Sequence, residues 1–225
     1  MSTAPSVRPL LSARWPPGRP ERYVRVTGRI DAEQSLRRRG LGKIPCLQKP
    51  FEPALLVEAV RGIPEELWDF EDSLKPNRFE TLDRTRHIVF RFVQDLRDWR
   101  TDYSRPAWES WRALIEPVLA QAVAPYGYAR GVFPRVMFAR MAPGGVIQPH
   151  RDNMPAALWP HKIHVPLQTN DKVGFFIEPK TWHFARGQAV EVNNLGVHAV
   201  RNDGDTDRIH LIFEYYDPDQ PSWLS

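Results

Sequence analysis

The first half of the chain has two stretches in which apolar residues recur every three or four positions, the spacing of an amphipathic helix. One lies around residues 53–62 and the other around 106–124, where Ser104 is a candidate cap. Pro117 should kink or split the second helix, because it removes a backbone donor and crowds the preceding turn. The stripes consist of Leu55, Leu56, Ala59, Val60 and Ile63, and of Trp108, Trp111, Ile115, Val118 and Ala122.

Short apolar runs, separated by turn residues, dominate the rest of the chain and are typical of β-strands. Because helices come first and strands follow, we expect helices packed outside an all-β barrel or sandwich. The segment Asn202-Asp203-Gly204-Asp205 tolerates positive φ and predicts a hairpin turn between the last two runs. The runs are 86–93, 135–141, 146–149, 161–168, 173–178, 189–192, 197–201 and 208–216.

The length of 225 residues suits one domain, which we place at 23–225. Residues 1–22 carry five prolines with arginines between them, which favours a disordered tail. An Arg-rich targeting presequence is the alternative for this segment.

The composition limits the kinds of site and partner that this chain is expected to have. A single cysteine, Cys46, excludes an internal disulfide framework and a Cys-based zinc cluster. No apolar run reaches the roughly 18–20 residues that span a bilayer. The net charge of +4 comes without a lysine-rich run. We therefore expect a soluble, cytoplasmic protein with neither membrane nor nucleic-acid partners, and the oligomeric state is left open.

Three side chains have the chemistry and spacing of a metal site. His150 and Asp152 stand at i and i+2 in an extended segment, so their side chains point to the same face. His198 follows on a later strand. Two imidazoles and one carboxylate form the facial triad of non-haem Fe(II) oxygenases.

A fourth residue, Arg208, strengthens this interpretation. It lies ten residues after His198, across the predicted hairpin, where strand pairing would bring it to the floor of the same cavity. A buried guanidinium is suited to a dicarboxylate, because its planar fork pairs both carboxylate oxygens.

Four motifs in order resemble the aspartyl/asparaginyl β-hydroxylase family. They cover about residues 135–216 and read MAPGGVIQPHRD (141–152), HKIHVPL (161–167), HAVRN (198–202) and DRIHL (207–211). The resemblance implies a double-stranded β-helix, the jelly-roll or cupin-like fold, with flanking N-terminal helices. It also implies Fe(2+), 2-oxoglutarate and O2 as requirements, with succinate and CO2 as coproducts.

The resemblance also implies roles for single residues. His150, Asp152 and His198 take the metal, Arg208 the far carboxylate of 2-oxoglutarate, and His164 helps to hold the cosubstrate. Lys162 matches a basic position that faces a carboxylate of cosubstrate or substrate. Some members carry a serine at the position of Ala139, where this chain has no hydroxyl to assist Arg208.

Other polar and aromatic side chains are better explained by structure. We expect structural roles for His161, His183 and His210, which have no partner at metal spacing, and for Arg151, which should point away from the metal. Strand packing is expected for Met137 and Ala139. Trp159, Trp182 and His183 are weaker candidates for the pocket mouth, and His87 and Arg91 are not expected to be ligands.

These expectations converge on a 2-oxoglutarate-dependent dioxygenase that hydroxylates an unactivated C–H bond. A free amino acid or an Asp/Asn-type peptide side chain would be its carboxylate-bearing substrate. Two alternatives stay open: a non-catalytic jelly-roll protein that binds a metal or a small carboxylate, and a zinc hydrolase with the same ligands.

Overall fold

A computed structural model describes residues 53–76, 78, 84–152, 154–177, 180–192, 194 and 196–219. The predicted tail at 1–22 and Cys46 lie outside the described residues.

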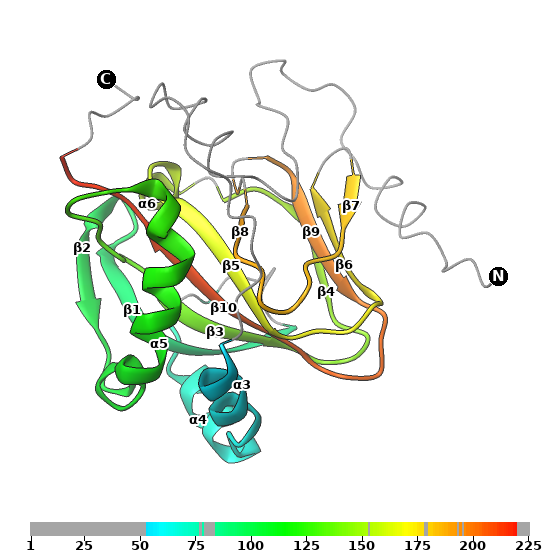
Figure 1. Ribbon diagram of the computed structural model, residues 1–225. Coiled ribbons are helices and arrows are strands. Elements are labelled where there is room, and N and C mark those ends of the chain that lie inside the picture. The colour runs from blue at the N-terminus through cyan, green and yellow to red at the C-terminus, as the bar shows by residue number, and fades with distance from the viewer. Residues whose placement is uncertain are drawn as a thin grey trace.

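Two antiparallel sheets form the framework (Figure 1). From β3 onward the chain alternates between them, returning from β4 to β5, from β7 to β8 and from β9 to β10. This alternation is the topology of a double-stranded β-helix, as predicted. The six-stranded sheet has the order β2 (Asp98–Ser104), β1 (Thr85–Asp95), β3 (Val136–Met141), β10 (Arg208–Tyr215), β5 (His161–Gln168) and β8 (Val190–Glu191). The four-stranded sheet has the order β4 (Val146–His150), β9 (His198–Asn202), β6 (Val173–Ile177) and β7 (Lys180–Trp182).

Helices cover the outer face of the six-stranded sheet, where α5 lies across the strands (Figure 1). Their apolar faces and the outward residues of the strands make one core, which includes Ile115, Phe138 and Leu211. The helices on this face are α3 (Ala54–Arg61), α4 (Glu65–Ser73) and α5 (Ala107–Val123), followed by the short η2 (Ala124–Tyr126). The later α6 (Pro155–Leu158) packs instead with Val89 and Met137.

Three details of the helix predictions were wrong. The helix α5 follows Pro106 rather than a Ser104 cap, since Ser104 ends strand β2. Pro117 does not split α5, which is continuous through it. On α3 the buried stripe runs through Leu56, Val57 and Val60, whereas Leu55 is 77% exposed.

Alternation along β10 gives the sheet two different faces. Ile209, Leu211, Phe213 and Tyr215 pack into the core beneath the helices. The intervening positions, which begin with Arg208, therefore point toward the four-stranded sheet. The space between the sheets thus receives polar side chains that the helix-covered face excludes.

The connection from β9 to β10 corrects another prediction. The two strands do not pair as a hairpin, because β9 belongs to the four-stranded sheet and β10 lies between β3 and β5 in the other. Residues 203–207 carry the chain from one sheet to the other. Arg208 therefore reaches the neighbourhood of His198 across the sandwich and not along a shared ladder.

Asn202 anchors this crossing. It is fully buried, and its side-chain amide donates to the carbonyl oxygens of Met141 (3.2 Å) and Thr206 (2.9 Å). Its side-chain oxygen accepts from the Gly204 amide and from the Asn170 side chain. One side chain thus satisfies backbone groups of β3 and of the connecting segment at the point where the chain changes layer.

Replacing this side chain should weaken the whole domain. N202A leaves several buried donors and acceptors unpaired, and we expect a loss of about 2–4 kcal/mol in the free energy of unfolding. Urea unfolding followed by tryptophan fluorescence measures the change. D205A, at an exposed position of the same crossing, is the control, and equal midpoints for the two variants would contradict the anchoring role.

Candidate metal centre

Strand pairing brings the two candidate histidine ligands together. His150 ends β4 and His198 begins β9, and the two residues are direct partners in the antiparallel ladder. A register irregularity between Ile147 and His150 precedes this pair. The two imidazole centroids lie 4.3 Å apart. Residues 48 positions apart in sequence thus meet at one end of the small sheet.

Asp152 joins them from just beyond the end of β4. Its backbone amide donates to the carbonyl of Asn194 (2.9 Å), and the Asn194 side chain donates to the carbonyl of Ala157 (2.9 Å). These two bonds tie the segment after β4 to the segment before β9. No sequence motif singled out Asn194, so its positioning role was missed.

The resulting geometry suits a metal ion. One potential ligand atom from each of His150, Asp152 and His198 lies within 4.8 Å of the other two. The Nδ1 atom of His150 lies 2.8 Å from the carbonyl of Gln148, and that of His198 lies 3.0 Å from the carbonyl of Gly196. Protonated Nδ1 atoms donating to these carbonyls leave both Nε2 lone pairs available, an arrangement found in many metal sites.

Charge at the centre favours the deprotonated forms that bind metals. Burial lowers the pKa of His198 to about 4, so its ring is neutral at pH 7. Burial by itself would raise the pKa of Asp152, but the Lys162 ammonium and the neighbouring imidazoles hold it well below its usual range. Lys162 donates to the Asp152 carboxylate, so the structure places Lys162 beside a candidate ligand.

Arg208 is buried between the sheets with 1% of its surface exposed. Its guanidinium lies 5.0 Å from the ring centre of Phe175 on β6 of the opposite sheet. Among the described residues no carboxylate forms an ion pair with it, and its Nε has no hydrogen-bond partner. Burial lowers the pKa of Arg208 to about 9, which still leaves it charged at neutral pH. A buried cation of this kind is matched to an anionic ligand.

Two further histidines lie near this arginine. His164 faces inward, at 88° to the ring of Phe175, and its buried Nε2 has no partner among the described residues. His210, which we expected to be only structural, lies 2.9 Å from Arg208, measured from Nδ1 to Nη2. Its position two residues after Arg208 on the same strand was the signal that could have identified it.

The remaining candidates lie elsewhere in the fold. His161 belongs to a buried network, with its Nδ1 2.8 Å from Glu191 and its Nε2 2.7 Å from the Tyr128 hydroxyl. Trp159 stacks on Trp99, and Met137 packs in a small cluster beside Ala156. His183 is exposed, Trp182 packs against the inner apolar cluster, Ala139 is buried opposite His210, and Arg151 is partly buried next to the ligands.

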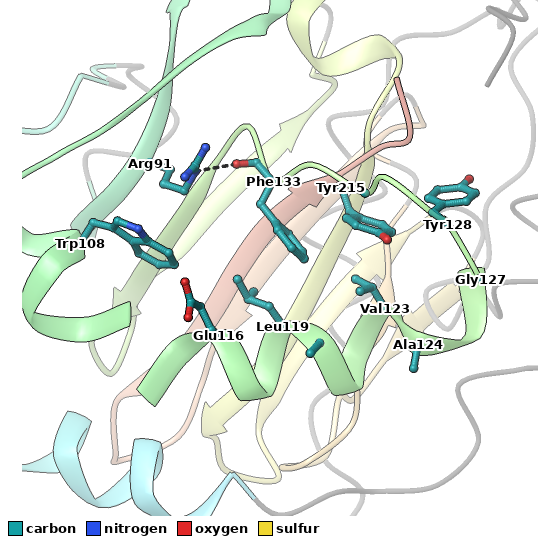
Figure 2. A pocket seen from close by; sticks show the side chains of 12 residues that line it. Arg91, Trp108, Glu116, Leu119, Val123, Ala124, Gly127, Tyr128, Phe133 and Tyr215 are labelled. Carbon is teal, nitrogen blue, oxygen red and sulfur yellow. Dashed lines mark hydrogen bonds between the residues drawn. The ribbon is translucent and has the colours of Figure 1, made fainter. Parts of the chain in front are cut away.

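A groove of about 540 Å³ lies on the helix side of the large sheet, away from this centre (Figure 2). Figure 2 shows Phe133, Tyr128 and Tyr215 facing α5 across it. Arg91 donates to the Phe133 carbonyl at its rim (2.9 Å). The residues that line this groove include none of the candidate metal ligands. The volume of the groove therefore gives no support to a metal site there.

Within the described part of the chain, no helix has both the length and the apolar character needed to cross a membrane.

Removal of one candidate ligand should abolish metal binding. We expect H198A and D152A to lose affinity for Co(II), used as a probe, by more than about 100-fold, since even outer-shell partners are worth 10–100-fold. Calorimetric titration measures the affinity. H183A removes an exposed histidine and should bind like the wild type. Wild-type affinity in H198A would rule out this centre.

Comparison with known proteins gives an independent result. Residues 116–218 match the family model described as Aspartyl/Asparaginyl beta-hydroxylase. No curated protein matches the chain.

Solved structures show more distant similarity. A 2OG-Fe(II) oxygenase family oxidoreductase from Burkholderia pseudomallei shares 16% identity, with 58% of this chain and 65% of that chain covered and a TM-score of 0.44. A viral collagen prolyl hydroxylase from Paramecium bursaria Chlorella virus-1 shares 10% identity, with 75% and 95% covered and a TM-score of 0.47. A Pseudomonas putida prolyl-4-hydroxylase shares 15% identity, with 76% and 90% covered and a TM-score of 0.44. These scores are low, and the family model carries the assignment. Residues 116–218, which hold every candidate site residue, match the model of the aspartyl/asparaginyl β-hydroxylase family.

Proposed function

We propose that the protein is an Fe(II)- and 2-oxoglutarate-dependent dioxygenase that hydroxylates a C–H bond of a carboxylate-bearing substrate. The observation that carries the proposal is the buried guanidinium of Arg208, which has no carboxylate partner among the described residues and lies between the same two sheets as the His150, Asp152 and His198 cluster. The two features require different ligands, a metal ion and an organic anion. An iron ion with 2-oxoglutarate bound to it would provide both the metal ion and the organic anion.

The donor set fits iron. Two imidazole nitrogens and one carboxylate leave coordination positions open for cosubstrate and O2, as in the facial triad. When bound, iron with 2-oxoglutarate and O2 supplies the oxidation, in which one oxygen atom enters the substrate C–H bond and the other enters succinate as CO2 is released.

The protein's own residues position and shield the reactants. Arg208 would receive the far carboxylate of 2-oxoglutarate, and the neutral ring of His164 would contact the cosubstrate nearer the metal. Burial keeps the pKa of His164 well below its ordinary value, so it adds no second positive charge. Phe175 packs against both side chains and excludes water from them.

Lys162 has a supporting role in this scheme. Its ammonium pairs with the Asp152 carboxylate and helps to keep that carboxylate ionised and oriented toward the metal. We place it at the boundary between metal and substrate, where its other donors are available to a substrate carboxylate.

The substrate is proposed to be a free amino acid or an Asp/Asn-type side chain in a peptide. The family match supports this class, because its description names aspartyl and asparaginyl groups. The reaction would take place in the cytoplasm, with a small molecule or peptide as the partner.

Catalysis can be tested before the substrate is identified. Purified protein with Fe(II), O2 and 2-oxoglutarate should release succinate, and a metabolite extract should yield a product heavier by one oxygen atom. R208Q should raise the KM for 2-oxoglutarate by about 30-fold or more, since breaking a buried charge pair costs about 2–5 kcal/mol.

The control is R201Q, which alters an arginine paired with Asp203 outside the site. Neither succinate nor 2-oxoglutarate binding in the iron-loaded wild type would favour a non-catalytic metal-binding protein. Substrate cleavage without O2 consumption would favour a zinc hydrolase.

A further inference from the structure

His210 lies beside Arg208. Some members of the family that this chain resembles carry a serine at the position of Ala139, where its hydroxyl assists the arginine. Three strands align here, so that His210 on β10 is the direct partner of Ala139 on β3, and Ala139 is in turn the partner of His87 on β1. Ala139 cannot form a hydrogen bond through its side chain. The imidazole of His210 instead lies next to the guanidinium, with 2.9 Å between Nδ1 and Nη2.

Hydrogen-bond chemistry fixes the tautomer of this ring. A guanidinium has only donors, so the Nδ1 atom of His210 must accept the bond from Arg208. Burial and the adjacent positive charge keep the pKa of His210 well below its ordinary value, so the ring carries one proton. That proton must therefore reside on Nε2.

The Nε2–H group is then a buried donor without a partner among the described residues. The ring is held flat against Phe175, at an interplanar angle of 13° and a centroid distance of 5.3 Å. The Nε–H group of Arg208 is buried and unpartnered in the same way. Buried donors are almost always satisfied in working proteins, and two on neighbouring side chains are suited to an anion.

We infer that His210 is a second cosubstrate-binding residue, which orients the Arg208 guanidinium through Nδ1 and presents Nε2–H, from the other side of the ring, to the cosubstrate that Arg208 binds. The inference rests on the proposed function, in which this cosubstrate is 2-oxoglutarate. In this chain the histidine on β10 replaces a hydroxyl on β3. His210 is a neutral donor, so the site keeps a single positive charge from Arg208.

The test compares 2-oxoglutarate binding in shape-matched variants. H210F keeps a flat ring against Phe175 but removes both nitrogens. It should weaken 2-oxoglutarate binding to the Co(II)-loaded protein by about 10- to 100-fold, the worth of a hydrogen bond to a charged group. Its affinity for Co(II) itself should stay unchanged. R112Q, at an exposed arginine of α5, is the control.

A second variant tests the replacement directly. A139S restores a hydroxyl at the register partner of position 210, so the double variant H210F/A139S should regain much of the lost affinity. Equal affinities in H210F and the double variant would overturn the claim that the two positions supply the same contact.

The outcomes separate this inference from the proposed function. Tight 2-oxoglutarate binding in both wild type and H210F, but not in R208Q, would overturn the role of His210 and leave the function intact. No binding in the wild type would refute the function itself. If H210F does not fold, nitrogen NMR of the wild-type imidazoles carries the test: a ring protonated on Nε2 alone supports the inference, and a proton on Nδ1 overturns it.

Discussion

The buried guanidinium of Arg208, which has no counter-charge in the part of the chain that the structure describes, is the constraint that organises the centre of this protein. Moving a guanidinium out of water costs several kcal/mol unless an anion or a set of acceptors compensates it. Among the described residues Arg208 has one imidazole acceptor and the face of an aromatic ring. The fold therefore holds an unfavourable group in place, and a ligand that brings its own negative charge would remove that cost.

The double-stranded β-helix holds this charged side chain in the space between its two sheets. Its outer face is covered by helices and contains only apolar groups from β10, so the polar residues of that strand are directed inward. The opposite sheet supplies His150 and His198 at one end and Phe175 against the arginine. The metal ligands and the anion site consequently come from different sheets, and their spacing depends on how the sheets pack. The hydrogen bonds of Asn202, at the crossing between the sheets, help to fix that packing.

The amino-acid sequence predicted the parts of this arrangement that depend on residues close together along the chain. The i, i+2 spacing of His150 and Asp152 and the position of most strands follow from the periods of regular structure. The pairing of strands did not follow. A polar turn between two apolar runs is equally compatible with a hairpin and with a crossing between sheets, and only the packing of β3 against β10 distinguishes them. Strands β2 and β7 and helix α4 were missed because their apolar signal is weak.

The role of Arg208 is tested most directly by the unfolding free energies of the wild type and R208M, each with and without 2-oxoglutarate in the presence of Mn(II). If the guanidinium is retained for an anion, R208M should be at least as stable as the wild type without ligand, because it removes a buried unpaired charge. It should also gain no stability from 2-oxoglutarate, whereas the wild type is stabilised by mass action. An R208M variant that is less stable without ligand, and yet is stabilised by 2-oxoglutarate as much as the wild type, would contradict the account.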